Sequence, residues 1–150
     1  MSTTTTTAPA ADHGRDNAAA WADILRELAA RHAAAEAGET WRDNDEPEDP
    51  EEVAEEARES ALAVEVRGGW YAPGSLLDAD PVEFRITLTM GGPSLQIIGD
   101  IGAHGGASAP RLEYADWSTP WTRYTDAREL DGIDLPAALY WFTGLFWLGE

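Results

Sequence analysis

The chain has 150 residues, of which 43% are hydrophobic, a length and composition typical of one folded domain rather than of a disordered polypeptide. It contains no cysteine, which excludes disulfides, thiolate metal sites and cysteine nucleophiles and predicts a cytoplasmic protein. The formal net charge is −18 and all ten basic residues are arginines, so that direct binding to nucleic acid or to an anionic membrane surface is disfavoured.

The N-terminal residues 1–15 are rich in threonine and small side chains, and we predict that they form a disordered tail. They show neither the basic region nor the apolar region of a signal peptide. A helix is predicted over residues 17–37, because large side chains recur at the spacing of one helical face and Gly38 suits a helix end. Those side chains are Trp21, Ile24, Leu25, Leu28 and His32.

The segment 39–60 is strongly acidic: eleven carboxylates and two arginines give it a net charge of −9. Its second part is expected to be helical, because Asp49 can cap a helix and Pro50 suits the first turn. Residues 16–60 therefore form a predicted helical, highly acidic N-terminal region.

The remaining residues, 61–150, are predicted to form an α+β domain. Four short stretches alternate apolar and polar residues, with close connections, which indicates a small four-stranded antiparallel meander. One face of such a sheet needs a cover, and we assign it to a C-terminal helix over residues 135–148, capped by Asp134.

Several motifs in this domain occur in a characteristic order. They are Val64-Glu65-Val66-Arg67, Gly69-Trp70-Tyr71, Pro73-Gly74, Glu83-Phe84-Arg85-Ile86, Gly91-Gly92-Pro93, Leu112-Glu113-Tyr114-Ala115-Asp116-Trp117 and Thr119-Pro120-Trp121-Thr122. Together with the aromatic C-terminal segment, they resemble a family of small, acidic, uncharacterised proteins carried on plasmids and phages, over residues 64–150. The resemblance implies a mobile-element setting and brings no established activity.

The sequence predicts no catalytic, cofactor or metal site. His13, His32 and His104 stand alone, without the spacing of a metal-binding pair. The acidic run at 43–46 lacks the sixth-position glycine of a calcium loop, whether the loop is counted from Asp43 or from Asp45. The glycines at 99–106 are followed by a strand rather than by the helix that a phosphate loop requires.

Two interpretations remain open for the aromatic residues Trp117 and Trp121, which stand near Tyr124 in the sequence. They either pack at the rim of the sheet or, with Trp70 and Tyr71 of an earlier loop, form part of an interaction surface.

The leading functional hypothesis is an acidic protein-binding module that takes a basic, nucleic-acid-binding protein as its partner. In its specific form, the protein is a DNA-mimic inhibitor of a host nucleic-acid-processing or defence protein such as a restriction or CRISPR effector. Five carboxylates along about 12 Å of helix approach the charge density of duplex DNA, which has one charge per about 1.7 Å. The predicted partner-binding residues are Asp43, Asp45, Glu46, Glu51, Glu52, Glu55, Glu56, Glu59, Trp117 and Trp121.

The alternative hypothesis is a structural or accessory protein that forms a homo-oligomer, whose acidity serves only solubility or adaptation to salt. In that case the sheet and the aromatic C-terminal helix, which is apolar on more than one side, supply the contact.

Overall fold

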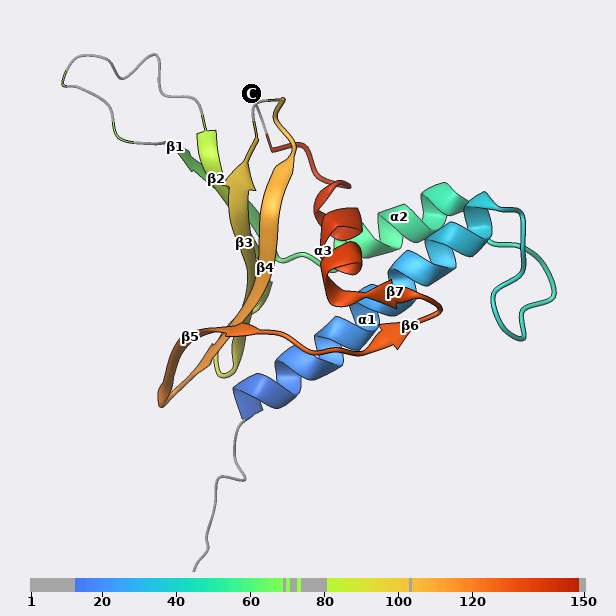
Figure 1. Ribbon diagram of the computed structural model, residues 1–150, viewed down its shortest axis with the longest axis horizontal. Coiled ribbons are helices and arrows are strands. Elements are labelled where there is room, and N and C mark those ends of the chain that lie inside the picture. Colours follow the sequence, from blue (N-terminus) through green and yellow to red (C-terminus); the bar gives the residue numbers. More distant parts are fainter. Residues whose placement is uncertain (1–12, 69, 71–72, 74–80, 103, 149–150) are drawn as a thin grey trace, which may run out of the picture.

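The computed structural model describes residues 13–68, 70, 73, 81–102 and 104–148. Helix α1 (His13–Glu36) begins at the first of these, so the prediction of a disordered tail is wrong for residues 13–15, which are helical. Residues 1–12 of the predicted tail lie outside the described part of the chain. Figure 1 shows the α+β architecture that the sequence predicts, with one antiparallel sheet and helices gathered on one side of it.

The sheet has five strands in sequential order, each antiparallel to its neighbour. They are β1 (Ala63–Gly68), β2 (Pro81–Thr89), β3 (Ser94–Ile101), β4 (Ala107–Asp116) and β5 (Thr119–Tyr124). The predicted meander is confirmed, but the prediction of four strands was one strand too few. The strand that it missed is β5.

Strand β5 was not predicted because it is short and contains Pro120. Proline is a poor strand residue wherever the backbone nitrogen must donate a hydrogen bond. In the fold β5 is an edge strand paired with β4 alone, where a missing N–H is tolerated. After β5 the chain forms a small two-stranded ribbon, β6 (Glu129–Leu130) and β7 (Ile133–Asp134).

The core lies between one face of the sheet and the helices. Alternate residues of the central strands point into it: Phe84 and Ile86 on β2, Ile97 on β3 and Leu112 on β4 are at most 2% exposed. Two helices supply the cover rather than the C-terminal helix alone, since α1 and α3 (Leu135–Thr143) both pack on β4.

The buried face of α1 is built largely from alanine. Ala18, Ala22 and Leu25 are fully buried, whereas Ile24, which the helical spacing also placed on the inner face, is 44% exposed. Leu25 and Leu28 are buried as the spacing predicts, and Trp21 packs against the core. The alanines beside them are small enough to let the helix backbone approach its neighbours closely.

The C-terminal helix is shorter than predicted. It begins after Asp134, whose side chain accepts a hydrogen bond from Ala137 N at 2.9 Å. It ends at Thr143, with Gly144 as the C-cap, instead of continuing to Leu148. Leu148 is nevertheless 3% exposed, because the chain beyond the helix turns back into the core.

Helix α2 (Pro50–Glu59) joins the acidic segment to the rest of the fold. Asp49 caps it, accepting a hydrogen bond from Glu51 N at 2.9 Å as the sequence predicts, and Val53 and Ala57 are buried in the same cluster as α1 and the sheet. The second half of the acidic segment is thus a packed helix, and residues 37–49 form the loop that connects α1 to it (Figure 1).

Candidate functional site

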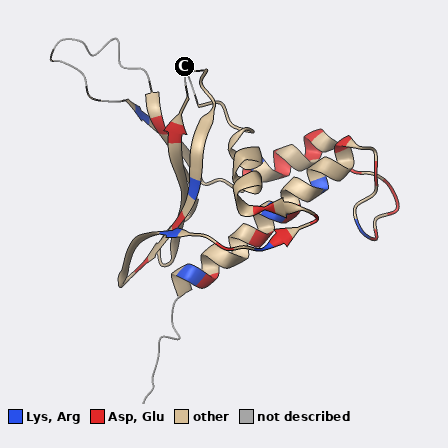
Figure 2. Cartoon of the chain, viewed as in Figure 1, with Lys and Arg blue, Asp and Glu red and all other residues tan. Residues whose placement is uncertain are grey.

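The acidic surface is formed by α2 and by the loop that precedes it, at one end of the molecule (Figure 2). Because Val53, Ala54 and Ala57 face inward, the helical repeat of 3.6 residues turns the glutamates of α2 outward. All five of these glutamates, at positions 51, 52, 55, 56 and 59, are exposed.

Arg31 on α1 neutralises part of this surface. Its guanidinium donates to Glu56 at 2.9 and 3.0 Å and to Glu48 at 2.7 and 3.2 Å, which connects α1 to α2 and to the preceding loop. The hydrogen bonds that Arg31 donates hold the pKa of the Glu56 carboxyl below its ordinary value. The same bonds, accepted by Glu48 and Glu56, raise the pKa of Arg31.

Arg58 neutralises a second part from within α2 itself. It lies 2.8 Å from Glu55 and 3.4 Å from Glu51, and its Nε donates to the carbonyl of Leu145 at 3.1 Å. Three of the predicted partner-binding carboxylates, Glu51, Glu55 and Glu56, are therefore ion-paired within the chain.

The other five predicted carboxylates are exposed, and within the described residues their side chains have no hydrogen bond or ion pair. They are Asp43, Asp45 and Glu46 on the loop and Glu52 and Glu59 on α2. Glu52 and Glu59 are seven residues apart, so they lie on the same face of the helix about 10 Å apart along its axis. We call these five residues the open carboxylates.

The predicted aromatic residues lie elsewhere. Trp117 is 93% exposed in the turn between β4 and β5, and Trp121 is 48% exposed on β5. Figure 1 places this turn at the lower left and α2 at the right, so the structure does not bring the tryptophans and the acidic surface together. Trp70 is also exposed, and Tyr71 lies outside the described residues.

Trp117 does have one close neighbour. A Cβ atom added to Gly92 would lie 2.6 Å from its indole Nε1, so the edge of the ring lies against the turn between β2 and β3. This contact fits the rim-packing interpretation, while the exposure of the ring leaves it available to a partner.

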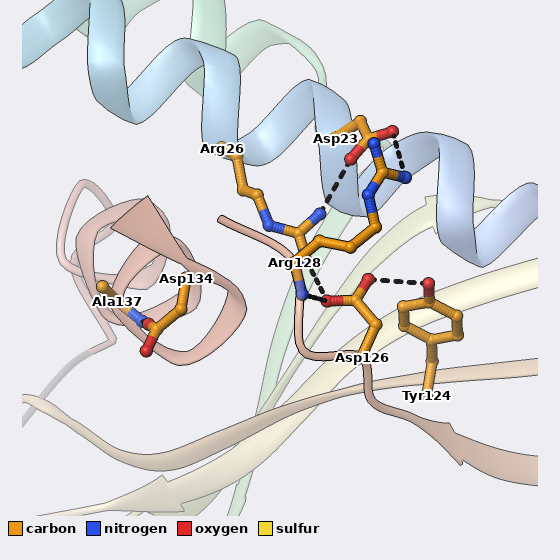
Figure 3. A network of polar contacts seen from close by, with 7 residues as sticks. All are labelled: Asp23, Arg26, Tyr124, Asp126, Arg128, Asp134 and Ala137. Carbon is orange, nitrogen blue, oxygen red and sulfur yellow. Dashed lines mark hydrogen bonds and ion pairs between the residues drawn. The ribbon is translucent and has the colours of Figure 1, made fainter. Parts of the chain in front are cut away.

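A buried polar network, which the sequence did not suggest, lies between α1 and the chain that follows β5 (Figure 3). The side chain of Arg26 is 1% exposed and forms ion pairs with Asp23 and Asp126. Tyr124 donates to Asp126 at 2.7 Å, and Arg128 lies 3.0 Å from Asp23. Burial raises the pKa of Asp126, but the hydrogen bonds from Arg26, Tyr124 and the Arg128 backbone outweigh burial, so the pKa stays below its ordinary value.

The spacing of the alanines around Arg26 is a sequence signal for its buried position, although it does not identify Asp126 as the partner. Arg26 stands four residues after Ala22 and three before Ala29, both of which are buried, so it occupies the inner face of the helix. A buried arginine requires a carboxylate. Asp23 and Arg128 reach the solvent, but the central pair of Arg26 and Asp126 is shielded from it, and we assign the network a structural role.

Comparison with known proteins gives no match: no family model, no curated protein and no solved structure matches the chain. The resemblance to plasmid- and phage-borne proteins therefore stays a prediction. Within the described residues, no helix combines the length and the apolar character that crossing a bilayer requires.

Proposed function

We propose that the protein is an acidic protein-binding module that presents its open carboxylates to a basic surface of another protein. The observation that carries the proposal is the concentration of unpaired, exposed carboxylates on α2 and on the loop before it (Figure 2). In a protein of net charge −18, a cluster of this kind accelerates association with cationic partners and repels nucleic acid.

The pattern of arginine contacts supports the same choice of partner. Nine of the ten arginines, all within the described ranges, contact a carboxylate or an aromatic ring; Arg123 is the exception. The chain thus offers little free positive charge to a phosphate backbone, while negative charge remains in excess.

The specific form of the proposal is DNA mimicry, directed at a nucleic-acid-processing or defence protein of the host. Glu52 and Glu59 supply two unpaired charges on one face of α2, and Glu55 and Glu56 lie between them in ion pairs. Exposed ion pairs of this kind contribute about 0–1 kcal/mol, so a groove rich in lysine and arginine can replace Arg31 and Arg58 at modest cost.

The test is capture from host lysate with the wild-type chain and with the variant Glu52→Lys/Glu59→Lys. The expected result is that the variant loses a basic protein that the wild type retains. The matched control is Asp100→Lys/Glu129→Lys, which makes the same change of net charge at exposed acids outside the acidic surface and should retain the partner. Equal capture by the wild type and both variants would reject the proposal.

A competition experiment distinguishes DNA mimicry from the more general proposal of an acidic protein-binding module. If the captured protein binds where DNA binds, an excess of duplex DNA should release it from the wild-type chain. Retention of the partner in the presence of duplex DNA would reject mimicry and leave an acidic module that binds a different basic surface.

A further inference from the structure

Strand β1 is an edge strand whose outer side is unpaired within the described residues. All six of its residues are exposed. Val64 and Val66 pair with Ile86 and Phe84 of β2, so they lie on the core-facing side of the sheet, yet they remain 39% and 45% exposed. An exposed edge with apolar side chains is the kind of strand to which another strand adds.

The opposite side of β1 carries charges that alternate in sign along and across the strands. Arg67 is ion-paired with Glu83 on β2. Glu65 lies 2.7 Å from Arg85, which is also on β2. Each row across β1 and β2 therefore contains one positive and one negative charge, in opposite order in the two rows.

We propose that two copies of the chain associate through antiparallel pairing of their β1 strands, with Val66 opposite Val66 of the second copy. This register places Glu65 opposite Arg67 of the second copy, and Arg67 opposite its Glu65. Each row of charges then continues across the new boundary with strictly alternating sign, from Glu83 and Arg67 of one copy to Glu65 and Arg85 of the other.

The charges select this register over its neighbours. A two-fold axis perpendicular to the sheet keeps the apolar sides of both copies together. Because a shift by one residue would move the side chains of one strand to the opposite face, the alternative registers differ by shifts of two residues. The next register in one direction places Glu65 opposite Glu65, and the next in the other direction places Arg67 opposite Arg67. Like charges directly opposite each other destabilise a strand pair, whereas opposite charges stabilise it.

The net charge of each copy opposes association, but its densest part is remote from β1. Figure 2 shows the acidic surface at the right of the molecule, while β1 runs toward the upper left in Figure 1. At physiological salt, exposed charges are screened beyond about 8 Å. A contact between two short strands is small, so we expect a dissociation constant of about 10 μM or weaker.

Sedimentation equilibrium at protein concentrations from about 1 to about 500 μM tests the association. The wild type should pass from monomer to dimer, and Val66→Lys, which places two lysines opposite each other, should weaken the dimer at least about tenfold. The matched control is Val82→Lys, at a valine of similar exposure, 41%, one strand away from the edge. A monomeric wild type, an intact Val66→Lys dimer, or equal loss in both variants would overturn the proposal.

A charge exchange tests the register itself. The variant Glu65→Arg/Arg67→Glu/Glu83→Arg/Arg85→Glu reverses all four charges, so it preserves the pairs within a copy and between identical copies. Mixed with the wild type, it places like charges opposite each other at both positions. We expect two separate homodimers and at least about tenfold fewer mixed dimers than random exchange gives; free mixing would overturn the register. Neither experiment depends on the acidic surface, so the outcome is independent of the proposed function.

Discussion

Arg26 on α1 is ion-paired with Asp126, which lies one hundred residues further along the chain. The contact joins the N-terminal helix to the segment that follows the last strand of the sheet (Figure 3). The Arg26 side chain is 1% exposed and that of Asp126 is 12% exposed, so this pair is shielded from water and its loss is expected to be costly.

We predict that Asp126→Asn lowers the free energy of unfolding by about 3 kcal/mol. The substitution keeps the shape of the side chain and removes its charge, which leaves a buried guanidinium with Asp23 as its remaining carboxylate, and breaking a buried pair costs about 3–5 kcal/mol. Urea unfolding followed by circular dichroism measures the change.

The control for this prediction is Arg128→Gln, in the same network. The Arg128 side chain is 65% exposed where it meets Asp23, so its loss should cost no more than about 1 kcal/mol. Equal destabilisation by the two variants would contradict the distinction between the buried and the exposed pair.

Gly99 on β3 leads to a second prediction. A Cβ atom at this position would lie 2.9 Å from the ring of Phe84 and 2.9 Å from the backbone oxygen of Ser108. The ring is buried in the core and the oxygen belongs to the backbone, so neither can move freely, and Gly99→Ala should destabilise the protein by about 1–3 kcal/mol.

Gly106, in the loop between β3 and β4, provides the comparison. A Cβ atom there would have no neighbour within 4 Å, so Gly106→Ala is expected to change stability by no more than about 0.5 kcal/mol. Thermal denaturation of both variants checks the prediction, and a Gly99→Ala variant as stable as the wild type would contradict the close contact.

The contact between Arg31 and Glu56 makes stability depend on pH. Because the hydrogen bonds from Arg31 lower the pKa of Glu56 in the folded protein, the unfolded state binds the proton more tightly. The pair therefore stabilises the fold above the ordinary pKa of glutamate, and this contribution is lost as the pH falls through the lowered value. The Glu56 side chain is 57% exposed, so the effect is no more than about 0.5 kcal/mol.

Melting temperatures of the wild type and of Glu56→Gln measure this dependence. The wild type should be the more stable at about pH 7, and the difference should be smaller at about pH 3, because protonation of Glu56 weakens its contact with Arg31. A difference that is the same at both pH values would show that the carboxyl acts through packing rather than through its charge.

The regular parts of the fold could be predicted from the sequence because their signals are local. Alternation on β2 and the cap at Asp49 depend on residues within one element. Contacts between distant elements could not be predicted in this way: nothing near Arg31 in the sequence indicates that it binds Glu56, and nothing near Arg26 indicates Asp126. The sequence therefore predicted which carboxylates form the acidic surface, but it did not predict that Arg31 and Arg58 would neutralise three of them.

Substitution of Arg58 tests the proposed function through a gain in binding affinity rather than a loss. Its ion pairs with Glu55 and Glu51 compete with any basic partner for the same carboxylates. Under the proposed function, Arg58→Gln should therefore strengthen binding of the captured partner by about 2–5-fold at low salt, with the gain shrinking as salt screens the charges. Isothermal titration calorimetry across a salt series measures the effect.

The matched control is Arg85→Gln, which removes the same charge from an exposed ion pair with Glu65 on the sheet, away from the acidic surface. It makes the same change in net charge, so a general electrostatic attraction would strengthen binding in both variants alike. A gain confined to Arg58→Gln assigns the contact to the carboxylates of α2. No gain in either variant would mean that Glu51 and Glu55 do not meet the partner, and would restrict the binding surface to the open carboxylates.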